Sequence, residues 1–254
     1  MGGQGYPAPT RKGVMIMGRT VTDMDAVRRM AVKFLYVDIA ETNFGFVASH
    51  PFTNTWVGFL PKVGERLGEM VDLHDEDSAD RWRVVLRERI DGAGLHDLFM
   101  MMNKPYILNF IKFIEPYLSD ADLGDVLGSC WTRIEQISLD DSITGQDVVE
   151  WFTRADKSKL MDEEDRASFD ALPDMVTVYR GVTSHNKKQK KAFSWSTSRD
   201  TAEWFADRFQ TGTGEVWTLT VPKERILCSF EGRGEHEVIV NLYGFNEKPL
   251  VEKV

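Results

Sequence analysis

The sequence predicts an α+β protein in which a helical lobe precedes a small, β-rich lobe. Between residues 21 and 172, apolar residues recur at the spacing of one helix face, and helix-capping residues stand before most of these runs. After Pro173 the pattern changes to short alternating strands separated by glycines. We therefore expect a flexible arm over 1–20, a helical lobe over 21–172 and a β-rich lobe over 173–254. One continuous domain over 21–254 fits the same pattern.

Composition excludes several classes of function. The 254 residues carry a formal net charge of -9, which argues against nucleic acid as a direct ligand, because neutralising phosphates needs a basic face. No secretion signal and no apolar run of membrane-spanning length is present. Cys130 and Cys228 match no metal or redox spacing, so we expect two buried, reduced thiols. A cytoplasmic protein without membrane partners is the expectation.

The helical lobe is expected to consist of amphipathic helices, each burying one apolar stripe. The second helix should end at Gly92, and Pro105 fits the first turn of the third. The segment 43–62 has no clear period and receives no assignment. The expected helix starts are, in chain order, Thr22, Ser78, Asn103, Ser119 or Asp120, Thr144 and Asp162.

The β-rich lobe is expected to hold short strands and one helix. Residues 199–206 change abruptly to helical period, with Asp200 as the expected cap and Glu203 as the residue that reaches back to it. This helix directly follows an alternating strand, so the two form a strand-to-helix corner. The expected strands are 176–180, 193–198, 215–221, 226–230, 237–241 and 249–253.

Three polar features of this lobe point to a binding site. Arg180 interrupts an apolar strand face, and a half-buried arginine is costly unless it meets an anion. The hydroxyls of 196–198 stand at a strand end beside a helix N-terminus. Glu235 and Glu237, two residues apart, are expected to point the same way at the start of a strand. Two carboxylates on one face indicate a shared task or exposure to water.

In order and in local context, the segments Tyr179–Gly181, Trp195–Ser198 and Glu235–Glu237 resemble the three motifs of the arginine-serine-glutamate, cholera-toxin-like class of mono-ADP-ribosyltransferases. The match covers roughly the last third of the chain. The resemblance implies an ADP-ribosyltransferase-type split, mixed β-sheet behind a helical lobe. It also implies NAD as substrate, no metal, and transfer of ADP-ribose to an arginine of a target protein.

The resemblance assigns a role to each residue of the first two motifs. Arg180 would hold the NAD pyrophosphate bidentately, in a way that lysine would not. The backbone of Gly181 would hold the nicotinamide carboxamide, because glycine allows close approach. Ser196 would hydrogen-bond the catalytic glutamate, while Thr197 and Ser198 would shape the floor of the site.

The third motif would carry the chemistry. Glu237 would stabilise the oxocarbenium-like centre that forms when the bond between nicotinamide and ribose breaks. Glu235 would orient or deprotonate the acceptor arginine. The preceding loop, 229–234, would recognise the target with Phe230 as its anchor. The basic run 187–191 is either a solvated hairpin tip or a contact to NAD phosphates or an acidic target.

Other interpretations of these residues stay open. Hydrolysis of NAD by water is the alternative within enzymes, and a non-catalytic protein-binding or inhibitor module on the same fold is the alternative outside them. For Arg180 the alternative is a purely structural role, in a salt bridge. For Glu235 and Glu237 it is a charge pair that protects an edge strand from aggregation. His236 is expected on the opposite side of the strand.

Overall fold

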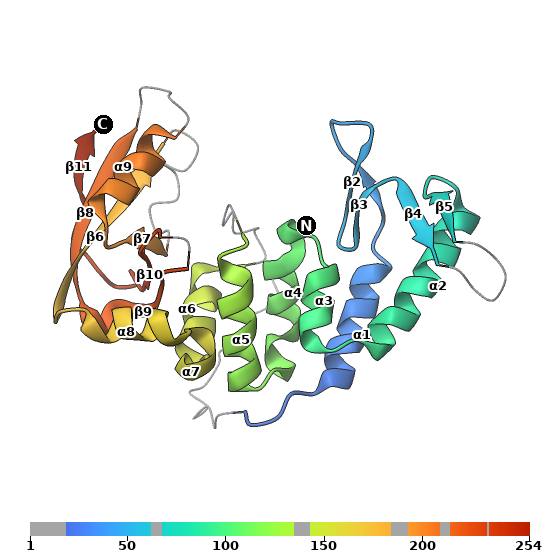
Figure 1. Ribbon diagram of the computed structural model, residues 1–254, viewed down its shortest axis with the longest axis horizontal. Coiled ribbons are helices and arrows are strands. Elements are labelled where there is room, and N and C mark those ends of the chain that lie inside the picture. The colour runs from blue at the N-terminus through green and yellow to red at the C-terminus, as the bar shows by residue number, and fades with distance from the viewer. Residues whose placement is uncertain (1–18, 62–67, 135–142, 184–192, 209–213, 233) are drawn as a thin grey trace, which may run out of the picture.

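The computed structural model describes residues 19–61, 68–134, 143–183, 193–208, 214–232 and 234–254. Nearly all of the expected N-terminal arm lies outside these ranges. A helical lobe and a β-rich lobe lie side by side (Figure 1), which confirms the α+β class. Among the described residues, no helix combines the length and the apolar character needed to cross a membrane.

Helix-capping side chains begin most helices of the first lobe. Ser119 Oγ accepts from the backbone N–H of Asp122, and Thr144 forms the expected capping box with Asp147. The second helix begins with Asp75 as its cap, not with Ser78 as the sequence suggested. Within the described ranges, these helices are α1 (Met24–Leu35), α2 (Glu76–Gly92), α3 (Leu95–Met101), α4 (Ile107–Ile114), α5 (Asp120–Trp131), α6 (Gly145–Arg154), α7 (Lys157–Leu160) and α8 (Glu163–Ala171).

The first lobe is not purely helical, which corrects the expectation for 21–172. Short strands lie between α1 and α2 at the end of the lobe farthest from the β-rich lobe (Figure 1). They form one sheet of order β1-β2-β3 and a separate β4-β5 hairpin. The strands are β1 (Ala40–Glu41), β2 (Val47–His50), β3 (Thr53–Thr55), β4 (Val57–Leu60) and β5 (Glu69–Asp72).

The β-rich lobe is one antiparallel sheet with the strand order β11-β8-β6-β7-β10-β9. Every pairing among the described residues is antiparallel, so the expected mixed sheet is wrong. The predicted strands are present within one or two residues, except that the strand expected at 193–198 is shorter. They are β6 (Met175–Val182), β7 (Ser194–Ser196), β8 (Glu215–Pro222), β9 (Ile226–Phe230), β10 (Glu237–Val240) and β11 (Leu250–Lys253).

The helix α9 (Arg199–Asp207) packs on one face of this sheet, against β6 and β8. Its cap is Ser198, whose Oγ accepts from the backbone N–H of Thr201. The expected cap, Asp200, lies in the first turn instead, and Glu203 pairs with Arg199. The corner from strand to helix is therefore confirmed, but it begins two residues earlier than predicted.

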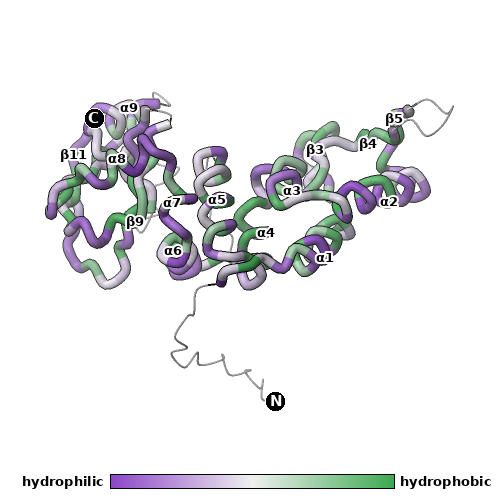
Figure 2. Tube along the Cα trace, turned by 60° about the horizontal axis from the view of Figure 1, so that its bottom comes forward, coloured by the Kyte–Doolittle hydropathy of each residue, from purple (hydrophilic) through white to green (hydrophobic). Residues whose placement is uncertain are grey.

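The main hydrophobic core extends through both lobes. The apolar stripe of α4 is fully buried at its centre, and Figure 2 shows α4 among the hydrophobic stretches of the lobe. Cys228, Phe230 and Ile239 of β9 and β10 belong to this same core. Both cysteines are buried and free, as expected, and burial raises the pKa of each thiol. The opposite face of the sheet has a core of its own, which includes Trp195.

Candidate active site

A row of cross-strand partners brings the three motifs together. Tyr179 of β6 lies opposite Ser196 of β7, and Ser196 lies opposite Glu237 of β10. The row continues to Phe230 of β9. Directly opposite residues in antiparallel strands share a face, with their Cβ atoms about 4.5–5.5 Å apart. Ser196 and Glu237 are thus close neighbours on one face, although 40 residues of chain separate β7 from β10.

Arg180 reaches this site from the other face of the sheet. Because side chains alternate along a strand, the Arg180 side chain leaves β6 on the opposite face from Tyr179. Its cross-strand partner on β8 is Trp217. Among the described residues, β6 and β7 are paired only at Tyr179 and Ser196. Beyond this pair, Arg180 Nη1 donates to the main-chain carbonyl of Ser194. The guanidinium therefore lies against the start of β7, at Ser194, which is paired with Ile239 of β10 and stands two positions from Ser196 in the row.

Electrostatics couple Arg180 to Glu237. Burial lowers the pKa of Arg180 to about 10, and the negative charge of Glu237 acts in the opposite direction. Because this value stays well above 7, the guanidinium keeps its charge at neutral pH. The candidate site thus contains a desolvated cation whose charge Glu237 partly balances.

The hydroxyl of Ser196 has a different partner from the one predicted. It donates to the main-chain carbonyl of Glu235 at 2.8 Å, and it accepts from the backbone N–H of Ser198 at 3.0 Å. The expected hydrogen bond to the carboxylate of Glu237 is therefore wrong in this structure. Ser196 instead ties the start of α9 to the segment that leads into β10. Thr197 adds a second tie, because its N–H donates to the carbonyl of His236 at 3.0 Å.

The two glutamates of the third motif do not share a strand. β10 begins at Glu237, and His236 just before it adopts a left-handed backbone with φ of 48°. Strand alternation does not extend through such a residue, so it no longer supports the expectation that Glu235 and Glu237 point the same way. Glu235 lies in the preceding turn and is partly buried. His236 is exposed, and its Nδ1 lies 2.6 Å from Glu231 Oε2.

The turn before β10 is attached to the helical lobe. Asp165 of α8 accepts from the backbone N–H of Glu231 at 2.6 Å, and burial raises the pKa of this aspartate. Ser229 Oγ donates to Glu231 Oε1 at 3.3 Å. Phe230 is only 4% exposed and lies in the main core, so its expected role as an exposed target anchor is wrong. The anchored turn fixes where β10 begins.

The carboxylate of Glu237 meets a residue that the sequence did not point to. Trp131, the last residue of α5, donates its indole Nε1–H to Glu237 Oε1 at 3.1 Å. The two residues are 106 positions apart in the chain. The only signal in the sequence was general: a buried tryptophan needs an acceptor for its N–H. The helical lobe therefore contributes a direct contact to the candidate catalytic residue.

Gly181 has a packing role. A Cβ atom at this position would lie 2.3 Å from the carbonyl oxygen of Ala202 and 2.6 Å from the N of Ala206. Both atoms are backbone atoms of α9, so neither can move away cheaply. The absence of a side chain at Gly181 thus lets α9 pack closely against β6. The sequence had suggested instead that it would let nicotinamide come close to the backbone.

Replacing Gly181 with alanine is expected to lower the free energy of unfolding by about 1–3 kcal/mol, because α9 must move away from the sheet. Urea unfolding monitored by circular dichroism measures this change. The matched control is Gly232→Ala, since a Cβ atom there would have nothing within 4 Å. The control is expected to stay within about 0.5 kcal/mol of the parent chain. Equal midpoints for the two variants would contradict the packing role.

Two sequence features lie outside the described residues. One is the basic run 187–191, which the structure does not place against the site; the other is residue 233 of the loop 229–234. Within the described ranges, no group of three or more His, Cys, Asp or Glu side chains is arranged to hold a metal ion.

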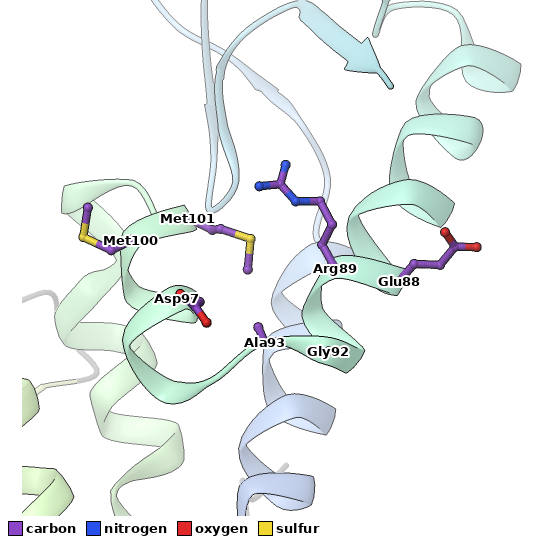
Figure 3. Close-up of a pocket in the computed structure, with 7 residues that line it drawn as sticks. All are labelled: Glu88, Arg89, Gly92, Ala93, Asp97, Met100 and Met101. Atoms are coloured by element: carbon purple, nitrogen blue, oxygen red, sulfur yellow. The ribbon is translucent and has the colours of Figure 1, made fainter. Parts of the chain in front are cut away.

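A separate hollow lies between α2 and α3 in the helical lobe. It has a volume of about 530 Å³, and the side chains of Arg89 and Met101 extend toward it while Glu88 points away (Figure 3). Helices α5 and α6 separate it from the β-rich lobe in Figure 1. None of the motif residues lines this hollow. Its lining is Glu88, Arg89, Gly92, Ala93, Asp97, Met100 and Met101.

Comparison of the chain with protein-family models, with curated proteins and with solved structures gives no match. The resemblance to the arginine-serine-glutamate class therefore rests on the three motifs themselves and on their order in the chain.

Proposed function

We propose that this chain is a mono-ADP-ribosyltransferase that moves ADP-ribose from NAD to an arginine side chain of a target protein, with nicotinamide as the leaving group. The observation that supports this proposal is the row Tyr179–Ser196–Glu237. It joins three motifs that are far apart in the sequence at one place in three neighbouring strands. A chance set of motifs has no reason to meet in this way.

The proposed reaction replaces one bond of the ribose C1′ atom by another. The bond from C1′ to the nicotinamide nitrogen breaks, and its electron pair leaves with neutral nicotinamide. The ribose becomes oxocarbenium-like, and the carboxylate of Glu237 stabilises its positive charge. A guanidinium nitrogen of the target then attacks C1′ and loses a proton, which Glu235 would accept.

Arg180 would hold the pyrophosphate of NAD. Its guanidinium is desolvated and charged at neutral pH, and it lies at the edge of the strand that carries Ser196. A planar guanidinium can bind two phosphate oxygens at once, whereas an ammonium group acts as a point charge. NAD in contact with both Arg180 and Glu237 would extend around the end of the short strand β7.

Hydrolysis of NAD is the second candidate, and the position of Glu235 favours it. The left-handed backbone at His236 keeps Glu235 out of β10, so the sheet does not hold its carboxylate beside that of Glu237. A base that is not fixed next to the reacting carbon selects less strictly between a target arginine and water. In that case free ADP-ribose would be the main product.

One experiment separates these functions from a non-catalytic module. The full chain and its Glu237→Ala variant are incubated with NAD labelled in the ADP-ribose part, with and without a cell lysate. Labelled protein bands that require Glu237, with the label located on an arginine by mass spectrometry, would support transfer. Free labelled ADP-ribose alone would support hydrolysis. Absence of both products across a broad set of lysates would exclude the enzyme.

The variant Glu235→Gln is expected to lower transfer to arginine by roughly 100-fold, since general-base catalysis contributes about that much. Hydrolysis of NAD should stay within about twofold of the parent, because Glu237 is unchanged. Product analysis by chromatography measures both activities in one assay. Glu224→Gln is the matched control, since Glu224 is an exposed glutamate of the same lobe. Equal loss of both activities would refute this division of labour.

A further inference from the structure

We propose that Trp131 is a positioning residue for Glu237, so that the helical lobe holds the catalytic carboxylate in its working orientation. The catalytic part of this inference rests on the proposed function, while the hydrogen bond itself does not. Trp131 Nε1 lies 3.1 Å from Glu237 Oε1. An indole N–H can only donate, and an ionised carboxylate can only accept, so the polarity of this contact is fixed.

The indole ring is held firmly on the helical side. Trp131 is 3% exposed, and its ring meets that of Phe152 edge to face, with centroids 4.8 Å apart and an interplanar angle of 89°. Phe152 belongs to α6 and is fully buried. Two helices thus fix the direction of the indole N–H before any substrate arrives, and the carboxylate adopts the rotamer that this donor selects.

The groups around Glu237 come from several elements. Arg180 of β6 attracts its charge, and Cys228 of β9 faces it as a thiol whose pKa is raised well above the usual value by burial. Lys157 of α7 and Asp165 of α8 act on the same thiol. The indole of Trp131 differs from all of these groups because it does not titrate. It therefore favours the ionised carboxylate at every pH.

A purely structural tryptophan and a positioning tryptophan predict different results. Trp131→Phe retains the buried ring and removes the N–H. If the residue only fills space, the variant alters stability and leaves the pH dependence of the reaction unchanged. If it positions Glu237, the carboxylate loses a donor that favours its ionised form, and the rate falls because the carboxylate is misplaced and protonates more easily.

The first measurement does not depend on activity. The full chain is labelled with ¹⁵N in its tryptophan side chains, and the indole N–H resonances are followed through a pH titration. We expect the Trp131 resonance, assigned by its absence in Trp131→Phe, to move as Glu237 takes up its proton. The movement should disappear in Glu237→Gln. If Trp131→Phe does not fold, the indole resonances of the parent and of Glu237→Gln are compared instead. A resonance that moves with pH in the parent and stays fixed in Glu237→Gln would establish the bond.

The second measurement is kinetic. Trp131→Phe is expected to lower kcat by roughly 10- to 100-fold, the range for loss of one charge-assisted hydrogen bond. The KM for NAD should stay near that of the parent, and the acid limb of the kcat profile should move to higher pH by roughly one unit. The matched control is Trp217→Phe. It removes a comparable bond, from Trp217 Nε1 to Glu215 Oε2 at 3.1 Å, and should leave the acid limb in place.

The outcomes distinguish the two proposals. The positioning role would be overturned if Trp131→Phe left kcat and the acid limb unchanged, or if the Trp131 indole resonance did not respond to the protonation of Glu237. Neither result would contradict the proposed transferase activity. A parent chain that neither transfers nor hydrolyses would overturn the proposed function, whereas the titration would still establish or refute the bond between Trp131 and Glu237.

Discussion

Replacing Glu237 with glutamine is expected to lower kcat for both ADP-ribose transfer and NAD hydrolysis by roughly 100- to 1,000-fold, the range for loss of one preorganised electrostatic contact. Glutamine has the same shape, and its amide oxygen can still accept from the indole N–H of Trp131. Only the negative charge is lost. Because that charge stabilises the oxocarbenium-like ribose in the proposed reaction, the effect should appear in kcat and much less in the KM for NAD.

Release of nicotinamide under single-turnover conditions measures this loss at the step where the bond breaks. Circular dichroism melts of the variant test whether the fold is retained. Glu224→Gln serves again as the control, because it makes the same substitution at an exposed position of the same lobe. A Glu237→Gln variant that keeps more than about one tenth of the parent kcat would be incompatible with electrostatic catalysis by this residue.

The fragment 173–254, which contains all three motifs, is expected not to fold without the helical lobe. Cys228, Phe230 and Ile239 lie in the core that α4, α5 and α6 build, and none of them is more than 4% exposed. Exposing a large side chain such as Phe230 or Ile239 costs about 1.5–3 kcal/mol, and exposing the smaller Cys228 adds to this cost. Together these losses take a large share of the whole stability of a typical domain, roughly 5–15 kcal/mol.

Polar contacts between the lobes would be lost from the fragment as well. Lys157 Nζ donates to the carbonyl of Leu227, and Asp165 accepts from the N–H of Glu231. The fragment should therefore give a poorly dispersed ¹H–¹⁵N spectrum, whereas the full chain should unfold in urea in one cooperative step. A dispersed spectrum from the fragment, or two separate transitions in the full chain, would show instead that the lobes fold independently.

The sheet could be predicted from the sequence because glycines and prolines separate its strands, and apolar and polar residues alternate clearly along them. Pro173 and Pro222 border strands, and β9 has the predicted bounds. The small strands near 40–72 could not be predicted, since runs of two to four residues carry too little periodicity. The cap of α9 was ambiguous because Ser198 and Asp200 are both good caps, and only the backbone conformation decides between them.

The candidate site could be predicted as a set of residues, but its internal contacts could not. The family resemblance implied that Ser196 lies beside Glu237, and the pairing of β7 with β10 agrees with this, while the partner of the Ser196 hydroxyl depends on a turn that the sequence does not specify. Strand alternation could not be extended back to Glu235, because His236 is a rare non-glycine residue with positive φ. Trp131 was missed because contacts between distant segments arise from packing of the whole chain.

The length of β7 restricts how this chain can vary. β7 has three residues and pairs with a strand on each side, and its central position, Trp195, faces away from Ser196. One residue inserted into β7 or β10 would turn Ser196 and Glu237 to opposite faces, although every motif residue would still be present. Homologous chains that retain the site should therefore differ in length between these strands and keep the strands themselves at constant length.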